Sequence, residues 1–204
     1  PHPFREWNDA YRDAIRQFWL EDIARGYGEG VADIASRISG SSDIFYYRGP
    51  TSSINFITAH DGFTLNDLVS YTTKNNLVNQ EDNRDGASDN RSWNAGIEGS
   101  TDDAQILAIR QSLKKSMLAT LLLSSGVPML TMGDEVSRSQ AGCNNAYSMP
   151  RDMSAAIADS PETFGGGWAM DWELDAAQKV IRDAVEMLAS IRTNNLAVVA
   201  SEFF

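Results

Sequence analysis

The chain has 204 residues and a mass of 22.4 kDa, enough for one large domain or two small ones, and 42% of its residues are hydrophobic. This composition, with a mean hydropathy of −0.33, is typical of a globular chain and excludes extensive disorder. The 17 Lys and Arg against 28 Asp and Glu give a formal charge of −11, which repels nucleic-acid phosphates and anionic lipids. We therefore expect no nucleic acid and no membrane among its partners, and the longest apolar run, 117–123, is too short to cross a bilayer.

The cysteine and histidine content excludes the common metal sites. Cys143 is the single cysteine, and His2 and His60 are the two histidines, so we expect neither an internal disulfide nor a Cys/His zinc site. The acidic loop 81–86 matches the first half of an EF-hand loop, but Ser92 stands where a bidentate Glu is required. That loop is therefore predicted to be solvated or to contact sugar, and we expect no metal and no cofactor.

The sequence opens with Pro-His-Pro and has no initiating Met. The residues that follow show no cationic region with an apolar core behind it, which is the pattern of a signal peptide. We expect the chain to be a piece of a longer polypeptide, and we expect that parent protein to be cytoplasmic.

The first third of the chain predicts two helices and a strand. Apolar residues recur at helical spacing from Trp7 to Trp19, which predicts an amphipathic helix that buries both tryptophans. Gly26, Gly28 and Gly30 end this helix, and a shorter helix is predicted over 31–38. The short apolar run 54–57 predicts a strand buried on both faces.

The middle of the chain begins with a long polar stretch, 58–100, which predicts a functional loop with a short helix around 65–71. Ser100 or Thr101 is predicted to cap the next helix. The apolar face of that helix is formed by Ile106, Ile109, Leu113, Met117 and Leu121.

The last third predicts a second buried strand over 127–132 and, after another irregular segment, a helix around 177–188. The run 196–204 has β-type composition. Alternating strands and helices predict a parallel α/β sheet, and because a complete (β/α)8 TIM barrel takes about 250 residues, the chain fits the last βα units of one.

Polar residues follow both predicted strands, where parallel α/β folds gather their functional groups. The segment Thr58 to Gly62 (TAHDG) follows the first strand, and Gly133-Asp134-Glu135 follows the second. A neutral His60 can donate to a sugar hydroxyl, and Asp61 can stabilise an oxocarbenium-like transition state. The alternative is that His60 and Asp61 only cap the helix that follows. Trp93, in the polar stretch, is a candidate platform for stacking on a sugar ring.

Several of these segments resemble a known enzyme family. Phe56 to Asp61 resembles the F-x-x-x-H-D motif at the end of the seventh barrel strand in the α-amylase family of glycoside hydrolases. A longer series, in family order, resembles bacterial glycogen debranching enzymes and isoamylases. Its blocks are Trp7-Asn8-Asp9, Tyr11-Arg12-Asp13, Thr58 to Leu65, Asn83-Arg84-Asp85-Gly86, Gly126 to Leu130, Gly133-Asp134-Glu135 and Asn144-Asn145-Ala146-Tyr147.

This resemblance implies a retaining hydrolase that cleaves α-1,6-glucosidic branch points in glycogen or a related α-glucan. It implies that residues 1–195 are the C-terminal part of the catalytic barrel and that residues 196–204 begin a β-sandwich domain. Asp61 matches the family's transition-state stabiliser and His60 its neighbouring sugar-binding histidine. The other expected substrate-binding residues are Asn83, Arg84, Trp93, Asp134 and Asn145.

The chain departs from the family pattern in two places. The family's nucleophile and general acid lie on earlier barrel strands, and no matching motif occurs here, so we expect this chain alone to be inactive. Residues 148–167 form an extra segment that leaves the preferred branch length open.

Two other functions remain open: an α-amylase-family hydrolase or transglycosylase acting on α-1,4-glucans, and a non-catalytic α-glucan-binding domain. The expected partners are a branched α-glucan and the remainder of the parent polypeptide. Because its apolar strands lack the first half of a barrel, we also expect the isolated chain to self-associate.

Overall fold

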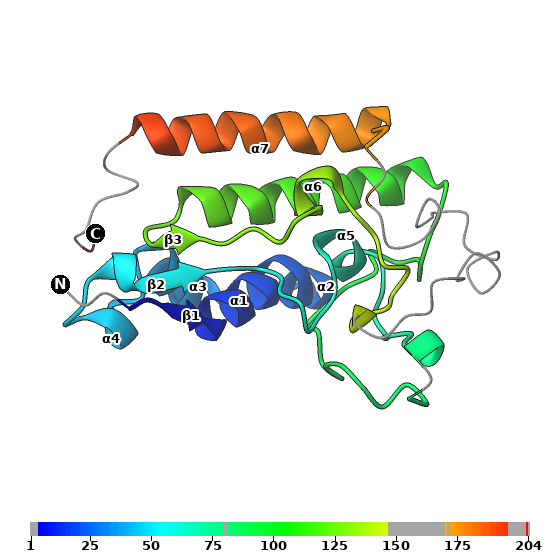
Figure 1. The fold of residues 1–204 in the computed structure, drawn as a ribbon, viewed down its shortest axis with the longest axis horizontal. Helices are drawn as coiled ribbons and strands as arrows, with labels where there is room; N and C mark the ends of the chain where they lie inside the picture. The colour runs from blue at the N-terminus through cyan, green and yellow to red at the C-terminus, as the bar shows by residue number, and fades with distance from the viewer. Residues whose placement is uncertain (1–3, 80, 147–169, 171, 196–202, 204) are drawn as a thin grey trace. The chain divides into compact units, whose positions relative to one another are not determined.

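The computed structural model describes residues 4–79, 81–146, 170, 172–195 and 203. The chain divides into two compact units. Unit 1 comprises Pro1–Ile57, Lys115–Leu130 and Arg182–Phe204, and unit 2 comprises Thr58–Lys114 and Thr131–Ile181. Figure 1 shows the elements in chain order. The strands are β1 (Glu6–Asn8), β2 (Ser53–Asn55) and β3 (Val127–Pro128), and the α-helices are α1 (Asp9–Arg16), α2 (Asp22–Arg25), α3 (Val31–Ile38), α4 (Ser42–Phe45), α5 (Leu65–Leu68), α6 (Ala104–Leu123) and α7 (Ala176–Asn194).

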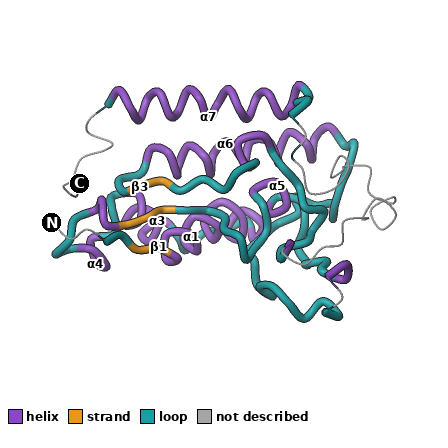
Figure 2. Tube along the Cα trace, in the orientation of Figure 1, coloured by secondary structure: helices purple, strands orange, loops and turns teal. Residues whose placement is uncertain are grey.

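Unit 1 contains a parallel sheet of three strands in the order β1-β2-β3. Trp7 pairs with Ile54, and Ile54 pairs with Val127, both in parallel register. Beyond the last paired residues, the Met129 N–H donates to the Asn55 carbonyl at 2.7 Å. The predicted parallel α/β sheet is confirmed, and Figure 2 shows how short its strands are beside the helices.

The strands are shorter and less buried than predicted. β2 ends at Asn55, so the predicted strand residues Phe56 and Ile57 follow it, although both are buried. The predicted buried strand 127–132 is wrong in extent and in burial, because β3 has two half-buried residues and Met132 is 67% exposed. In the described part of the chain, β3 is the last strand in the sheet order and pairs with β2 alone, without the second partner that buries a central parallel strand.

The predicted first helix begins later than its apolar pattern. Trp7 lies in β1 and is 52% exposed, so its predicted place in a buried helical face is wrong. Helix α1 starts after Asn8 and continues through a π-helical turn, Gln17–Glu21, into α2, which ends at Gly26 with φ +77°. A strand of three residues is too short to show an alternating pattern, and the spacing of Trp7 happens to fit the helical one.

The remaining helices mostly agree with the sequence. α3 spans Val31–Ile38, as predicted, and α7 contains the predicted run 177–188. The cap of α6 is Asp103 rather than Ser100 or Thr101, since its Oδ1 accepts from the N–H groups of Gln105 and Ile106 at 2.8 and 3.1 Å.

The predicted apolar face of α6 is mostly buried at Leu113, Met117 and Leu121, but Ile109 is 40% exposed. The predicted β-type run 196–204 lies outside the described residues except for Phe203. Among the described helices, none has the length and apolar character that a bilayer crossing requires.

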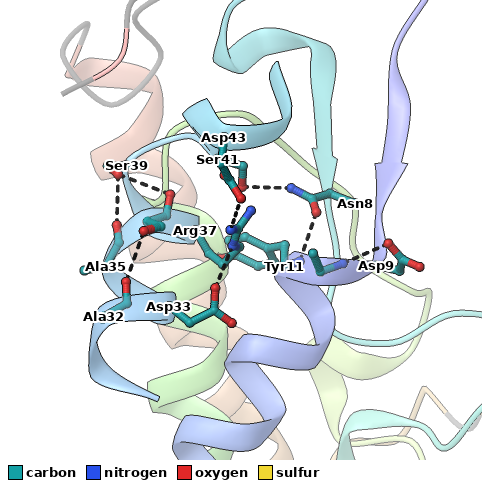
Figure 3. A network of polar contacts seen from close by, with 12 residues as sticks. Asn8, Asp9, Tyr11, Ala32, Asp33, Ala35, Arg37, Ser39, Ser41 and Asp43 are labelled. Atoms are coloured by element: carbon teal, nitrogen blue, oxygen red, sulfur yellow. Dashed lines mark hydrogen bonds and ion pairs between the residues drawn. The ribbon is translucent and has the colours of Figure 1, made fainter. Parts of the chain in front are cut away.

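A chain of buried polar side chains connects β1 and β2 inside unit 1. The Asn8 amide donates to the hydroxyls of Ser41 and Ser53 at 3.0 and 2.8 Å, and its oxygen caps α1 by accepting from the Tyr11 N–H at 3.0 Å. Figure 3 shows Asn8 between Ser41 and Tyr11. Asn8 is 2% exposed, so one side chain satisfies a helix terminus and two hydroxyls that water does not reach.

We predict that Asn8→Ala lowers the free energy of unfolding by about 2–4 kcal/mol, because it removes a helix cap and leaves buried hydroxyls without a donor. Asp9→Ala is the matched control, since Asp9 is exposed and its carboxylate accepts from the N–H of the adjacent Ala10 rather than from a distant buried group. The control is expected to cost about 0.5 kcal/mol. Denaturant unfolding measures both, and equal losses would contradict this role of Asn8.

Candidate functional site

The chain that follows β2 forms an exposed turn in unit 2 that carries His60 and Asp61. Both residues are exposed, whereas Thr58 before them and Phe63 after them are buried. The Phe63 N–H donates to Asn90 Oδ1 at 3.3 Å, which anchors the far side of the turn. Among the described residues, none donates a hydrogen bond to the Asp61 carboxylate. The turn therefore presents the Asp61 carboxylate to solvent, while the residues that flank the turn are buried.

The alternative role of His60 and Asp61 as helix caps is wrong. The helix after the turn is α5, and its N-cap is Thr64, whose hydroxyl oxygen accepts from the Asp67 N–H at 3.2 Å. α5 spans Leu65–Leu68 and is shorter than predicted. Because Thr64 already performs the capping, the exposed Asp61 carboxylate has no structural task at this helix.

Asp134 joins the turn to the segment that follows β3. It begins a short 3-10 helix, η4 (Asp134–Val136), and is 1% exposed. One carboxylate oxygen accepts from the Leu65 N–H at 2.9 Å, and the other accepts a short hydrogen bond from the Thr58 hydroxyl. Burial raises the pKa of Asp134 to about 6, although these two donors oppose the shift. Both oxygens are occupied, which suits a residue that holds backbone rather than one that binds sugar.

A second buried carboxylate, Asp67, holds α5 to the segment 139–142. Its oxygens accept from the Ser139 hydroxyl at 2.6 Å and from the Gln140 N–H at 2.8 Å, and the Gly142 N–H lies at 3.4 Å. Asp67 is fully buried, and burial raises its pKa from 3.8 to about 6 despite these donors. The segments after β2 and β3 are therefore tied together in unit 2 by two aspartates.

We predict that Asp67 makes the stability of unit 2 fall as the pH rises from about 4 to 6. The folded pKa lies above the unfolded one, so the stabilisation from the protonated carboxyl is fully present below pH 3.8 and is lost as the pH rises through about 6. Relative to Asp67→Asn, the free energy of unfolding should fall by about 3 kcal/mol over that range and then stay constant. Thermal unfolding of both proteins between pH 4 and 8 measures the difference. A difference that rises with pH, or that does not change, would contradict a buried carboxyl with a raised pKa.

The predicted sugar-contacting residues Asn83 and Asn145 belong to one polar cluster in unit 2. Asn83 Oδ1 accepts from the Asn76 N–H at 2.9 Å, and the Asn145 amide donates to Asp85 Oδ2 at 3.0 Å. Asn76 links the two parts, because its amide donates to Asn144 Oδ1 at 2.8 Å and to the Asp85 carbonyl at 2.9 Å. Burial raises the pKa of Asp85, but the amide donors outweigh it, so the net shift is downward. The cluster therefore fixes residues 76, 83 and 85 against residues 144 and 145.

Gly86 is essential to this packing. Its φ is +70°, and a Cβ there would lie 2.3 Å from Asn144 Oδ1. We predict that Gly86→Ala lowers the free energy of unfolding by about 3 kcal/mol through backbone strain and overpacking. Gly99→Ala is the matched control, since Gly99 has φ +77° but its nearest neighbour would lie at 3.5 Å. That control should cost only the strain, about 1 kcal/mol, and equal losses in a denaturant titration would show that the contact with Asn144 is unimportant.

The other two predicted sugar-contacting residues lie at or near the surface. The Arg84 side chain is 78% exposed, and its guanidinium lies 3.4 Å from the carboxylate of Asp82, which is also exposed. The Trp93 side chain is half-buried rather than fully exposed. The backbone N–H of Trp93 donates to the Leu68 carbonyl at 3.0 Å, which fixes the Trp93 backbone beside α5. Among the described residues, no hydrogen bond joins the side chain of Arg84 or Trp93 to Asp61.

Metal and thiol chemistry have few candidate groups here. Among the described residues, no group of three or more His, Cys, Asp and Glu side chains is placed to hold a metal ion. Cys143 is 2% exposed, and burial raises the pKa of its thiol. A thiol with a raised pKa is a poor nucleophile at neutral pH.

Thr58, Asp67 and Asn76 are not among the predicted site residues, although the structure places all three in the contacts that hold the two loops. Thr58 stands directly after a predicted strand, a position that could have drawn attention to it. Asp67 and Asn76 lie in polar loop sequence, and their burial depends on partners more than 65 residues away, Gln140 and Asn144.

Comparison with known proteins gives the chain close relatives. No family model matches it. It is 43% identical over 206 residues to the glycogen operon protein GlgX homolog of Mycobacterium tuberculosis, a match that covers 100% of this chain and 26% of the relative. The glycogen debranching enzyme of Serratia proteamaculans is 52% identical over 150 residues, which is 72% of this chain and 22% of that enzyme. The glycogen debranching enzyme of an Enterobacter species is 45% identical over 175 residues, or 85% of this chain and 24% of the enzyme.

The chain is homologous to a segment of bacterial glycogen debranching enzymes. The resemblance predicted from the motifs is thereby confirmed. The chain spans about a quarter of the length of the curated relatives it matches.

Solved structures show the same fold at lower identity. The pullulanase from Bacillus acidopullulyticus aligns with a TM-score of 0.63 and 21% identity over 97% of this chain and 20% of its own. The type I pullulanase from Bacillus subtilis, complexed with maltose, aligns with a TM-score of 0.59 and 22% identity over 97% of this chain and 23% of its own. The debranching-enzyme segment therefore has a pullulanase-like, mixed α/β fold.

Proposed function

We propose that this chain is part of a retaining glycoside hydrolase that cleaves α-1,6-glucosidic branch linkages in glycogen or a related α-glucan. The observation that carries this proposal is the identity of 43–52% with proteins named GlgX homolog or glycogen debranching enzyme. The exposed His60–Asp61 turn supports it, because it offers a carboxylate that does not cap α5 in the segment that follows a parallel strand. Pullulanases crystallised with maltose and with maltohexaose share the fold, which supports an α-glucan as the substrate.

Asp61 acts in this proposal through its charge. Cleavage of a glycosidic bond passes through an oxocarbenium-like transition state, and a carboxylate held near the sugar ring stabilises the positive charge that develops there. His60 donates to a hydroxyl of the same sugar. Asn83, Arg84, Trp93 and Asn145 contact neighbouring sugars of the chain, with Trp93 stacking on a ring.

The nucleophile and the general acid belong to other parts of the whole protein in this proposal. Residues 1–195 then form the C-terminal part of a (β/α)8 barrel, and residues 196–204 begin a following β domain. The remaining partners are the rest of the parent polypeptide and, for the isolated chain, a second copy of itself. Stored glycogen as substrate implies a cytoplasmic location.

The test is hydrolysis by the full-length protein of a branched limit dextrin, compared with a linear maltooligosaccharide of similar length. NMR resolves the anomeric protons of the two linkages, so it reports which bond disappears. We expect loss of α-1,6 signals with the α-1,4 signals unchanged. Loss of α-1,4 signals would show that the protein is a different α-amylase-family enzyme, and binding without any loss would show a glucan-binding domain.

A further inference from the structure

The turn that carries Asp61 is held at both ends by the segment that follows β3. At its start, the Thr131 hydroxyl donates to the Thr58 carbonyl at 3.1 Å, and the hydroxyl oxygens of these two threonines lie 3.0 Å apart. The Thr58 hydroxyl also bonds to Asp134. At its end, the Leu65 N–H donates to the same carboxylate at 2.9 Å. One buried side chain thus contacts both ends of the eight-residue segment 58–65, in which His60 and Asp61 are exposed, and all of these residues lie within unit 2.

We propose that Asp134 is a positioning residue, which sets the place of Asp61 by fixing Thr58 and Leu65. This inference rests on the proposed function, since it assigns Asp134 a role in the same site. Asp134 is 1% exposed and both its oxygens are occupied, so its contribution reaches the sugar only through Asp61 and its turn. Catalytic groups need positions accurate to a fraction of an ångström, and a neighbour that fixes the backbone supplies this accuracy.

The hydrogen-bond arrangement gives Asp134→Asn and Asp134→Ala different effects. In Asp134→Asn, the amide oxygen can accept from the Leu65 N–H and the amide nitrogen can donate to the Thr58 hydroxyl. That hydroxyl can then donate to the Thr131 hydroxyl 3.0 Å away. Thr58, Thr131 and Leu65 each keep a hydrogen-bond partner, so the turn stays fixed without the charge. In Asp134→Ala, the Leu65 N–H loses its acceptor and the start of the turn is held only by Thr131.

The experiment measures kcat and KM of the full-length protein on a branched limit dextrin for wild type, Asp134→Ala and Asp134→Asn. We expect kcat to fall about 10- to 100-fold in the alanine variant with a smaller change in KM, because misplacement weakens transition-state contacts more than binding. The asparagine variant should restore kcat to within about threefold of wild type, which is a free-energy difference of about 0.6 kcal/mol. Val136→Ala is the matched control, because Val136 is buried on the same 3-10 helix and its apolar side chain cannot form the hydrogen bonds that Asp134 makes to Thr58 and Leu65. It should lower the melting temperature but not kcat.

A double variant separates positioning from general destabilisation. If Asp134 acts through Asp61, then adding Asp134→Ala to Asp61→Asn should lower kcat by no more than about threefold beyond the single Asp61 variant. Losses that multiply would overturn the proposal, as would wild-type kcat in Asp134→Ala. A wild-type protein that cleaves no α-1,6 linkage would instead refute the proposed function. Hydrogen exchange of the peptide 58–65 then tests, without any activity, whether Asp134 fixes the turn. We expect faster exchange in Asp134→Ala than in Asp134→Asn, and equal exchange would contradict the positioning role.

Discussion

Replacing Asp61 by Asn in the full-length protein is expected to lower kcat on a branched α-glucan by about 10²- to 10³-fold or more. Removal of one preorganised electrostatic group has an effect of this size, because the amide keeps the shape but loses the charge that faces the oxocarbenium-like transition state. The melting temperature should stay within about 2 °C of wild type, since Asp61 is exposed and α5 is capped by Thr64 instead. Steady-state kinetics and thermal unfolding of the same samples measure the two quantities.

Asp102→Asn is the matched control for this variant, because Asp102 is an exposed aspartate before α6 whose first turn is capped by Asp103. It removes the same charge and should leave kcat unchanged. His60→Ala should reduce kcat less than Asp61→Asn, since it removes a binding contact and no charge. Near wild-type kcat in Asp61→Asn would show that Asp61 has no part in catalysis.

The isolated 204-residue chain is expected to hydrolyse no α-glucan. A retaining mechanism requires a nucleophile that forms the glycosyl-enzyme intermediate and an acid that protonates the leaving oxygen, and no segment of this sequence resembles the motifs that carry them. A reducing-end assay with glycogen measures turnover, on material whose size is checked by light scattering because we expect the chain to self-associate. Turnover that Asp61→Asn abolishes would place a complete active site within these residues.

The helices were the most predictable part of the fold. α6 and α7 present apolar residues at helical spacing over several turns, and this spacing, with the capping residues and glycines at the helix ends, located them; α3 was predicted with the same bounds after the glycines at 26–30. The cap of α6 was displaced because Ser100, Thr101, Asp102 and Asp103 are all capable of capping, and only the backbone geometry selects Asp103.

The sheet was less predictable because its strands have two or three residues. The sequence pattern does not reveal β1, because Trp7 continues the apolar spacing of the helix that follows it. The buried positions of β2 are Ser53 and Asn55, polar residues whose partners are Asn8 and the Ser125 carbonyl. No local pattern indicates such burial, since it depends on side chains from other parts of unit 1.

The position of the site could be predicted, but the contacts that hold its residues in place could not. The rule that functional groups follow parallel strands pointed to His60, Asp61 and Asp134. It did not distinguish the exposed Asp61 from the buried Asp134, because both aspartates follow an apolar strand. That distinction depends on contacts between residues about 70 positions apart, such as that between Leu65 and Asp134.

The central claim is that Asp61 stabilises charge for a nucleophile located elsewhere in the whole protein. Covalent trapping tests it most directly. A maltooligosyl fluoride carrying a second, deactivating fluorine accumulates the glycosyl-enzyme intermediate, and peptide mapping of the full-length protein locates the labelled carboxylate. We predict a label on a carboxylate outside these 204 residues and no label on any peptide within them. A label on Asp61 would make it the nucleophile and contradict the account.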